Sequence, residues 1–361
     1  MKDYFVYTEK MSVGYNGRPL IKDIEINLEK GQILTLIGPN GAGKSTILKS
    51  MIGQLGLIGG VVYIGREEMQ KMSEKELAKK LSVVMTERIH PELMTCEDVV
   101  STGRYPYTGR LGILSEKDRV KVREAMEMVD ALPLAQRDFS AISDGQRQRI
   151  LLARAICQEP EVIVLDEPTS FLDIRYKLEL LSILKKMVKE KNVAVIMSLH
   201  ELDLAQKISD VVVCVHGDRI EKSGPPEEIF TSEYIKELYG VAGGSYNAEF
   251  GCIEMEAPKG APEVFVIGGG GSGIPIYRQL QRKGIPFAAG ILHENDVDYP
   301  VAKALAVRVI AEKPFEEISG ETYKKALQTA RQCKEVINCV EKFGKFNEKN
   351  RQLLEESGHL L

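Results

Sequence analysis

A glycine-rich stretch between an apolar segment and a helical segment constrains this sequence more than any other feature. Residues 38–46 read Gly-Pro-Asn-Gly-Ala-Gly-Lys-Ser-Thr and match the pattern G-x-x-x-x-G-K-[ST]. Residues 33–37 before it are apolar and predict a strand, and residues 47–52 after it predict a helix. Glycines let several backbone N–H groups converge on phosphate oxygens, and the helix N-terminus adds partial positive charge. The sequence therefore predicts a phosphate-binding loop that joins a buried strand to a helix.

Each residue of this loop is a candidate contact for a bound nucleotide. Lys44 is expected to reach the β- and γ-phosphates, and the hydroxyl of Ser45 is expected to ligate Mg²⁺. The full candidate set is Gly38, Pro39, Asn40, Gly41, Ala42, Gly43, Lys44, Ser45 and Thr46.

Two acidic residues stand at the end of a second apolar segment. Residues 162–165 read Val-Ile-Val-Leu and predict a buried strand, which is followed by Asp166 and Glu167. A carboxylate at a strand end suits Mg²⁺, commonly through water, and this role falls to Asp166. Glu167 points elsewhere and is the candidate that polarises an attacking water. Adjacent acids after a strand also form ordinary solvated turns, but the phosphate loop earlier in the chain favours the catalytic interpretation.

A third motif lies between the phosphate loop and the two acids. Residues 142–149 read Ile-Ser-Asp-Gly-Gln-Arg-Gln-Arg, in front of a helix predicted over 144–158. With Ser143, Gly145 and Gln146, this stretch resembles the L-S-G-G-Q signature of ABC ATPases, although its first position is Ile142 and its first glycine is replaced by Asp144. Serine is also a good helix N-cap, so an ordinary capped helix is the alternative. Its position just upstream of the strand that carries Asp166 favours the signature.

Further positions match the same family over about residues 1–240. Residues 170–173 resemble the D-loop and end at Asp173, and His200, which follows an apolar segment, resembles the switch histidine that senses the γ-phosphate. Tyr15 occupies the place of the aromatic residue that stacks on adenine. The resemblance implies an α/β fold of the P-loop NTPase class: an ABC cassette with a mixed sheet and a helical subdomain. Apolar segments that alternate with helical patterns agree with a largely parallel sheet.

The resemblance also implies how the motifs work together. In this family two cassettes pair head to tail, and each ATP lies between the phosphate loop of one copy and the signature of the other. Ser143 and Gly145 would therefore serve the nucleotide of a second copy of this chain. The cofactors implied are ATP and Mg²⁺, and the catalytic residues implied are Lys44, Glu167 and His200.

One position departs from the family pattern. The family places a glutamine after the strand predicted over residues 81–85, and Thr86 stands there in this chain, followed by Glu87. Threonine or glutamate can ligate Mg²⁺ through oxygen, so Thr86 is a third candidate metal ligand beside Ser45 and Asp166. Neither side chain provides the amide donor of glutamine. We expect hydrolysis or its coupling to transport to be retuned here, and Thr86→Gln tests this: unchanged ATPase rate and coupling would contradict it.

Two segments resemble the importer branch that handles ferric siderophores, haem and cobalamin. They are residues 99–107, which contain Gly-Arg-Tyr-Pro-Tyr, and residues 224–240. The partners implied are integral membrane permease subunits and an extracytoplasmic binding protein, which places this chain at the cytoplasmic face of the membrane. No run of 18 or more apolar residues occurs, so any link to a membrane is expected through the permease. The net charge of −4 gives no support for nucleic acid as a partner.

The chain of 361 residues is long enough for two domains. We predict a first domain over residues 1–240, a linker over 241–262 that holds a short hairpin near 250–255, and a second domain over 263–361. We recognise no family in the second domain from its sequence motifs, and its strand–glycine–helix order predicts a small Rossmann-like α/β fold. Its loop matches G-x-G-x-x-G with Gly268, Gly270 and Gly273, and Glu294 follows 21 residues after Gly273. Two alternatives stay open: a loop that binds a dinucleotide-like ligand, or a regulatory or dimerising domain without a ligand.

Two other classes compete with the importer subunit. A soluble ABC ATPase of translation or DNA repair generally carries two cassettes or a long coiled coil between the phosphate loop and the signature, and this chain has neither. A nucleotide-responsive regulatory protein with a degenerate cassette is the other class, and the altered residue at Thr86 keeps it open. Intact Lys44, Asp166, Glu167 and His200 count against it. The six cysteines are scattered without a C-x-x-C pair and are expected to be reduced thiols.

Overall fold

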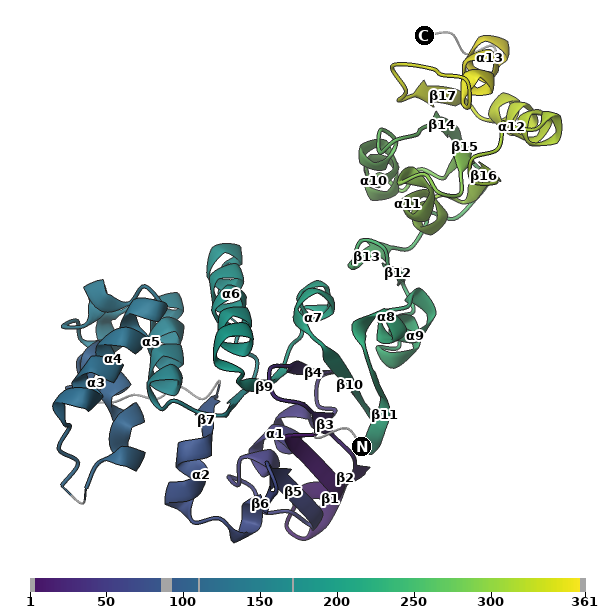
Figure 1. Ribbon diagram of the computed structural model, residues 1–361. Coiled ribbons are helices and arrows are strands. Elements are labelled where there is room, and N and C mark those ends of the chain that lie inside the picture. The colour runs from purple at the N-terminus through teal and green to yellow at the C-terminus, as the bar shows by residue number, and fades with distance from the viewer. Residues whose placement is uncertain (1–3, 86–92, 110, 171, 358–361) are drawn as a thin grey trace. The chain divides into compact units, whose positions relative to one another are not determined.

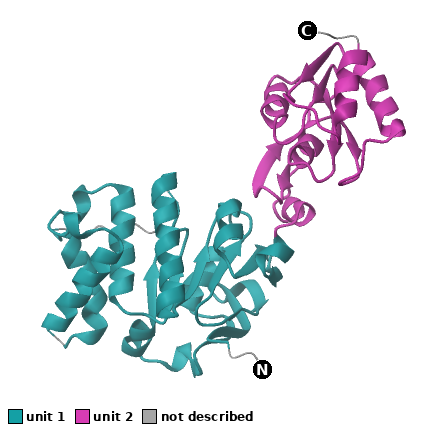
Figure 2. Ribbon diagram, turned by 45° about the horizontal axis from the view of Figure 1, so that its top comes forward, with its two compact units in different colours: residues 1–229 teal, residues 230–361 magenta. Residues whose placement is uncertain are grey.

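The computed structural model describes residues 4–85, 93–109, 111–170 and 172–357. The chain divides into two compact units, residues 1–229 and 230–361 (Figure 2). The division lies between Ile229 and Phe230, so residues 230–240, which we assigned to the first domain, belong to the second unit. No helix of the described ranges is long and apolar enough to cross a membrane.

A six-stranded sheet forms the centre of the first unit, in the order β11-β10-β4-β9-β8-β7 (Figure 1). All neighbouring strands are parallel except β10 and β11, which form an antiparallel pair at one edge. The predicted strands over residues 33–37 and 162–165 are confirmed with the same bounds, and both are buried on both faces, which explains their unbroken apolar sequences. The six strands are β4 (Ile33–Ile37), β7 (Leu81–Val84), β8 (Val162–Leu165), β9 (Ala194–Ser198), β10 (Val211–His216) and β11 (Arg219–Gly224).

A second, antiparallel sheet packs with the first through one helix. Helix α1 (Lys44–Met51) contributes Leu48 to a core that also contains Met11 of this second sheet and Leu36 of β4. The helix that follows the phosphate loop is therefore anchored between the two sheets. The antiparallel strands are β1 (Val6–Tyr15), β2 (Arg18–Ile24), β3 (Asn27–Leu28), β5 (Gly59–Ile64) and β6 (Glu67–Glu68).

A group of helices forms the helical part of the first unit, with α3, α4 and α5 side by side in Figure 1. Several helices here begin at a Ser or Thr whose side chain caps the helix and whose third following residue closes a capping box. Together with the mixed sheet, this group confirms the predicted cassette architecture. The helices of the unit after α1 are α2 (Glu74–Lys80), α3 (Cys96–Ser101), α4 (Glu116–Met128), α5 (Asp144–Cys157), α6 (Ile174–Lys191), α7 (Leu202–Ile208) and α8 (Pro226–Ile229).

The Gly-Arg-Tyr-Pro-Tyr segment forms a 3₁₀ helix, η2 (Thr102–Tyr107), whose arginine joins several elements. Arg104 is buried, and its guanidinium donates to Asp118 at 2.9 Å and to the backbone carbonyl of Cys157 at 2.7 Å. It also pairs with Glu159 at 2.9 Å and lies 4.0 Å from the ring of Tyr107. One side chain thus ties η2, α4 and the end of α5 together, which gives this motif a structural role in the helical part.

The second unit contains a two-stranded hairpin and a four-stranded parallel sheet in the order β16-β15-β14-β17. One face of this sheet packs Tyr277 against Phe287, and the other carries Phe265 and Ile291 in a separate core. Helices cover both faces, so the predicted small α/β domain is confirmed. Its elements are α9 (Ser232–Leu238), β12 (Gly244–Asn247), β13 (Cys252–Met255), β14 (Val264–Ile267), α10 (Ile274–Arg282), β15 (Phe287–His293), α11 (Asp298–Leu305), β16 (Arg308–Glu312), α12 (Gly320–Gln332), β17 (Glu335–Asn338) and α13 (Glu348–Glu356).

Candidate functional site

The phosphate loop connects β4 to α1 and closes tightly against the sheet. A Cβ on Gly38 would lie 2.1 Å from the carbonyl oxygen of Val215 on β10, and the φ of Gly38 is 145°, so only glycine fits there. Lys44 lies buried at the start of α1, and its ammonium donates to the carbonyls of Gly38 at 2.7 Å and Pro39 at 3.0 Å. Burial lowers the pKa of Lys44, although the nearby negative charges of Glu167 and Asp166 act in the opposite direction and raise it.

The carboxylate of Asp166 sits at the end of β8, within reach of the loop. Its Oδ1 atom accepts hydrogen bonds from the hydroxyl of Ser45 at 3.0 Å and from the hydroxyl of Ser198 at 2.7 Å. The Ser198 hydroxyl also accepts a bond from the backbone N–H of Glu167 at 2.9 Å. Sequence reasoning missed Ser198, although a hydroxyl at the end of the otherwise apolar strand β9 was a signal that it had a polar partner.

A carboxylate and a histidine form a close pair beside the loop. Glu167 Oε1 lies 2.5 Å from Nε2 of His200, and the hydroxyl of Ser170 donates to Glu167 Oε2 at 3.2 Å. Glu167 has a φ of 47°, so its backbone turns sharply just after Asp166 and the two adjacent carboxylates face different partners. The carboxylate therefore has two neighbours that fix its orientation.

Lys44, Ser45, Glu167 and His200 line one cavity of about 480 Å³, within the size range of small-molecule sites. Tyr15 lies at its side with its hydroxyl 3.1 Å from Oγ1 of Thr46, and the residue is 53% exposed, which leaves its ring available for a stacking partner. Leu20 of β2 also lines the cavity, and no sequence motif points to it. The lining residues are Tyr15, Leu20, Asn40, Gly41, Gly43, Lys44, Ser45, Thr46, Glu167 and His200.

The signature residues lie at the start of α5 and do not line this cavity. Ser143 and Gln146 form a capping box: the hydroxyl of Ser143 accepts from the N–H of Gln146 at 3.3 Å, and the Gln146 amide accepts from the N–H of Ser143 at 3.1 Å. A Cβ on Gly145 would lie 2.9 Å from the ring of Tyr176, which explains the glycine. Asp173 caps the neighbouring helix α6 by accepting from the N–H of Tyr176 at 3.0 Å.

One predicted site residue, Thr86, lies outside the described residues. The two other predicted metal ligands, Ser45 and Asp166, place a hydroxyl and a carboxylate oxygen 3.0 Å apart beside the phosphate loop. Such hard oxygen donors fit Mg²⁺.

In the second unit, the glycine loop directs its backbone donors at two carboxylates of the same chain. Oxygens of the buried Asp298 accept from the N–H groups of Gly269 at 2.6 Å, Gly273 at 3.0 Å and Ile274 at 3.2 Å. Asp296 accepts from the N–H of Gly270 at 2.9 Å. These are the donors that a phosphate would use at such a helix start, so the arrangement favours the alternative without a ligand.

The glycines of this loop also have packing roles. A Cβ on Gly268 would lie 2.4 Å from the hydroxyl of Tyr277, and one on Gly273 would lie 2.4 Å from Cζ of the same ring. Gly270 has a φ of 61° with open space around it, so glycine is favoured there by the backbone conformation and not by packing. The pattern G-x-G-x-x-G is therefore explained by the turn and by the buried tyrosine.

The fold and the first cavity together define a nucleotide-binding protein of the α/β class, and comparison with known proteins names the family. The family model described as ABC transporter matches residues 21–170, and a model named the MJ0874 family matches residues 287–360. An uncharacterized ABC transporter ATP-binding protein of Methanocaldococcus jannaschii is 40% identical over 286 residues, which are 79% of this chain and 99% of that protein. The chain belongs to the family of ABC transporter ATP-binding proteins.

Two further comparisons agree with this assignment. The iron(3+)-hydroxamate import ATP-binding protein FhuC of Bacillus subtilis is 36% identical over 234 residues, which are 65% of this chain and 87% of that protein. The solved structure of cbiO1 from Clostridium perfringens, part of an ABC transporter complex, is 26% identical with a TM-score of 0.56, and the match covers 65% of this chain and 94% of that one. The predicted ATP-binding activity of the cassette is therefore confirmed at the level of the family.

Proposed function

We propose that this chain hydrolyses ATP in the cavity of the first unit to energise an ABC importer. The observation that carries the proposal is the convergence of Lys44, Ser45, Glu167 and His200 on one cavity, from the start of α1 and the segments that follow β8 and β9. Asp166, which accepts a hydrogen bond from Ser45, lies directly beside them. A phosphate cradle alone binds nucleotide, whereas a cradle with an oriented carboxylate beside it also has a base for hydrolysis.

Each residue has a role that its surroundings support. The ammonium of Lys44 and the backbone N–H groups of the loop neutralise the phosphates, and the exposed ring of Tyr15 stacks on adenine. Glu167 orients and polarises the attacking water, and His200 is a positioning residue that holds Glu167 and approaches the γ-phosphate. Ser45 and Asp166 are the side chains that would hold Mg²⁺, which supplies positive charge against the developing negative charge of the phosphates.

A second copy of the chain completes the site in this proposal. Ser143, Gly145 and Gln146 do not line the cavity of their own copy, yet they expose a capped helix N-terminus that suits phosphate. Head-to-tail pairing would bring this helix start to the γ-phosphate of the other copy. ATP would then close the pair because its phosphates contact both copies only in the closed state.

The importer partners and the cargo rest on relatives and on the sequence motifs. We propose that the chain lies at the cytoplasmic face of the membrane, bound to permease subunits that work with an extracytoplasmic binding protein. The iron(3+)-hydroxamate import protein of Bacillus subtilis supports an iron–siderophore cargo, with haem and cobalamin as the related alternatives within the same importer branch. A cargo of this kind would contact the permease and the binding protein.

Replacement of the base tests the proposed chemistry. Glu167→Gln keeps the shape of the side chain and removes the charged oxygen, so ATP turnover should fall by about 10²–10⁴-fold while ATP binding persists. Steady-state phosphate release and nucleotide binding by the purified full chain measure the two quantities. Glu179→Gln on α6, where Glu179 pairs with Arg175, is the matched control and should leave turnover unchanged. Equal turnover in the two variants would remove Glu167 as the base.

A further inference from the structure

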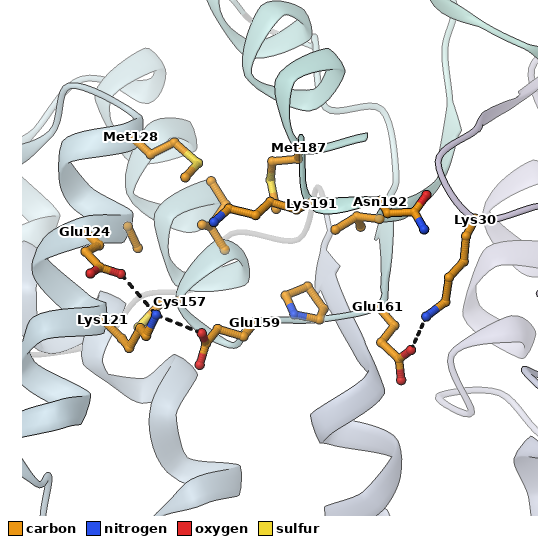
Figure 3. A pocket seen from close by; sticks show the side chains of 14 residues that line it. Lys30, Lys121, Glu124, Met128, Cys157, Glu159, Glu161, Met187, Lys191 and Asn192 are labelled. Carbon is orange, nitrogen blue, oxygen red and sulfur yellow. Dashed lines mark hydrogen bonds and ion pairs between the residues drawn. The ribbon is translucent and has the colours of Figure 1, made fainter. Parts of the chain in front are cut away.

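A second cavity of the first unit, of about 300 Å³, lies where strands β8 and β9 of the same sheet begin (Figure 3). Pro160 and Glu161 line it just before β8 begins, and Val193 lines it just before β9 begins. The phosphate loop and Glu167 of the first cavity instead follow the ends of strands. Because the parallel strands between their two ends are four or five residues long, roughly 15 Å of sheet lies between the two cavities. The second cavity is therefore not part of the nucleotide site.

The walls of this cavity come from both parts of the first unit. Helix α4 and the end of α5 contribute one wall, and the end of α6 and the starts of the strands contribute the other. The apolar lining includes Met128 of α4, Ile156 of α5 and Met187 of α6, and Ile156 and Met187 are buried. Unbranched thioether side chains adapt to apolar groups of different shape. The interior thus suits the apolar body of a small molecule.

The charges at the rim leave one cation without an anionic partner. Each lining carboxylate is already paired: Glu161 with Lys30 at 2.5 Å, Glu159 with Lys121 at 3.0 Å, and Glu124 with Lys121 at 3.2 Å. Lys191, the last residue of α6, has no ion-pair partner within the described part of the chain. In Figure 3 its side chain extends from α6 across the cavity toward the side of α4. The only unpaired charge that faces this space in the described residues is therefore positive.

We propose that this cavity is a binding site for a small organic anion with an apolar body, such as a short-chain carboxylate. The apolar body lies against Met128, Ile156 and Met187, and the anionic group pairs with the ammonium of Lys191. A neutral or cationic molecule of the same shape lacks this pair, because the carboxylates are held by lysines. The site takes its ligand independently of ATP, since no residue lines both cavities.

Methionine-methyl NMR on the full chain with hexanoate as the probe tests the site directly. Hexanoate should shift the methyl signals of Met128 and Met187, with a Kd on the order of millimolar for so small a ligand, and should leave exposed Met255 of the second unit unchanged. Hexanamide, which has the same shape without the charge, should bind roughly tenfold more weakly. Lys44→Ala, which removes a side chain of the nucleotide cavity, should not change the hexanoate shifts, so this test and the ATPase test fail separately.

Two variants of the exposed Lys191 separate a site from chance contact. Lys191→Gln should weaken hexanoate binding roughly tenfold, and Lys191→Arg should retain it because the positive charge remains. The proposal is overturned if neither methionine signal moves at concentrations well above the millimolar range. Equal affinity for hexanoate and hexanamide, or equal affinity in Lys191→Gln and the wild type, would also overturn it.

Discussion

Asp166 depends on two hydroxyl groups from different elements. Ser45 approaches from the first turn of α1 and Ser198 from the end of β9, and both donate to the same carboxylate oxygen. Ser198 in addition accepts from the N–H of Glu167, so one buried hydroxyl fixes both acidic residues at once. A network in which each buried polar group has a partner is sensitive to the loss of any member.

Ser198→Ala tests this role. The change removes the acceptor of the Glu167 N–H and a donor to Asp166, so the free energy of unfolding should fall by about 1–3 kcal/mol and ATP turnover should drop several-fold. Urea denaturation and phosphate release measure the two effects. Ser82→Ala on β7 is the matched control, because the hydroxyl of Ser82 is buried without a hydrogen-bond partner among the described residues and should cost little. The same result for both variants would contradict the role of Ser198.

At the scale of elements, Arg104 holds the helical part of the first unit together. Its guanidinium reaches Asp118 of α4, the carbonyl of Cys157 at the end of α5, and Glu159 just beyond it. Asp118 is itself buried and closes the capping box with Ser115 at the start of α4. Loss of the arginine would leave a buried carboxylate without its cation.

Arg104→Ala should therefore destabilise the helical part by about 3–5 kcal/mol. Hydrogen exchange should show a greater loss of amide protection in α3, α4 and α5 than in the four-stranded sheet of the second unit. Arg123→Ala is the matched control on α4, because Arg123 forms an exposed pair with Glu127 that contributes at most about 1 kcal/mol. A small, uniform effect of Arg104→Ala on hydrogen exchange would show that Arg104 does not stabilise the helical part.

Glu312 at the end of β16 gives the second unit a pH dependence. Its carboxylate accepts a hydrogen bond from the N–H of Ser319 at 2.7 Å. This bond and further hydrogen bonds to the carboxylate lower the pKa of Glu312 from 4.5 to about 2. Because the pKa is lowered, the carboxylate stabilises the folded state above pH 4.5, and this contribution disappears as the pH falls toward 2. It amounts to roughly 3 kcal/mol at most.

Glu312→Gln should therefore destabilise the second unit at pH 6 and should have little effect near pH 2. Hydrogen exchange of β15 and β16 as a function of pH measures this directly. Glu335→Gln at the exposed start of β17 is the control and should not change the acid dependence. A pH-independent effect of Glu312→Gln would contradict the origin assigned to the stabilisation.

The elements also show what the sequence could predict. Buried strands such as β4 and β8 are uniformly apolar and were predicted with the correct bounds, because burial on both faces leaves no other pattern. The antiparallel strand β1 was not predicted: its pairing with β5 shifts register between Glu9 and Ser12, which breaks the alternation that signals a strand. The hairpin near residues 250–255 was expected and is formed by β12 and β13.

Some site residues could likewise be predicted from the sequence, and others could not. The phosphate loop, Asp166, Glu167 and His200 follow strands at one sheet edge, so order along the chain was enough to bring them together. Ser198 was missed because its partners depend on which strands are neighbours in the sheet, which local sequence does not reveal. The glycine loop of the second unit shows the converse: backbone N–H groups donate to a phosphate or to a carboxylate equally well, and Asp298 lies 25 residues beyond Gly273.

For the whole molecule, we propose that two copies of the chain share each ATP. The phosphate loop and the base lie in one cavity, while Ser143 and Gly145 lie at a helix start outside it. These residues serve ATP only if another copy presents them. For the second unit, whose glycine loop is engaged by its own aspartates, we propose a regulatory or dimerising role without a ligand.

Sedimentation of Glu167→Gln tests this claim most directly. This variant should be a monomer without nucleotide and a dimer with ATP–Mg²⁺, because slowed hydrolysis leaves ATP in place to bridge the two copies. Adding Ser143→Arg to this variant should abolish the dimer while ATP binding persists, since the cradle is intact. A monomer at saturating ATP, or a dimer that Ser143→Arg leaves unchanged, would show that two copies do not share ATP through Ser143.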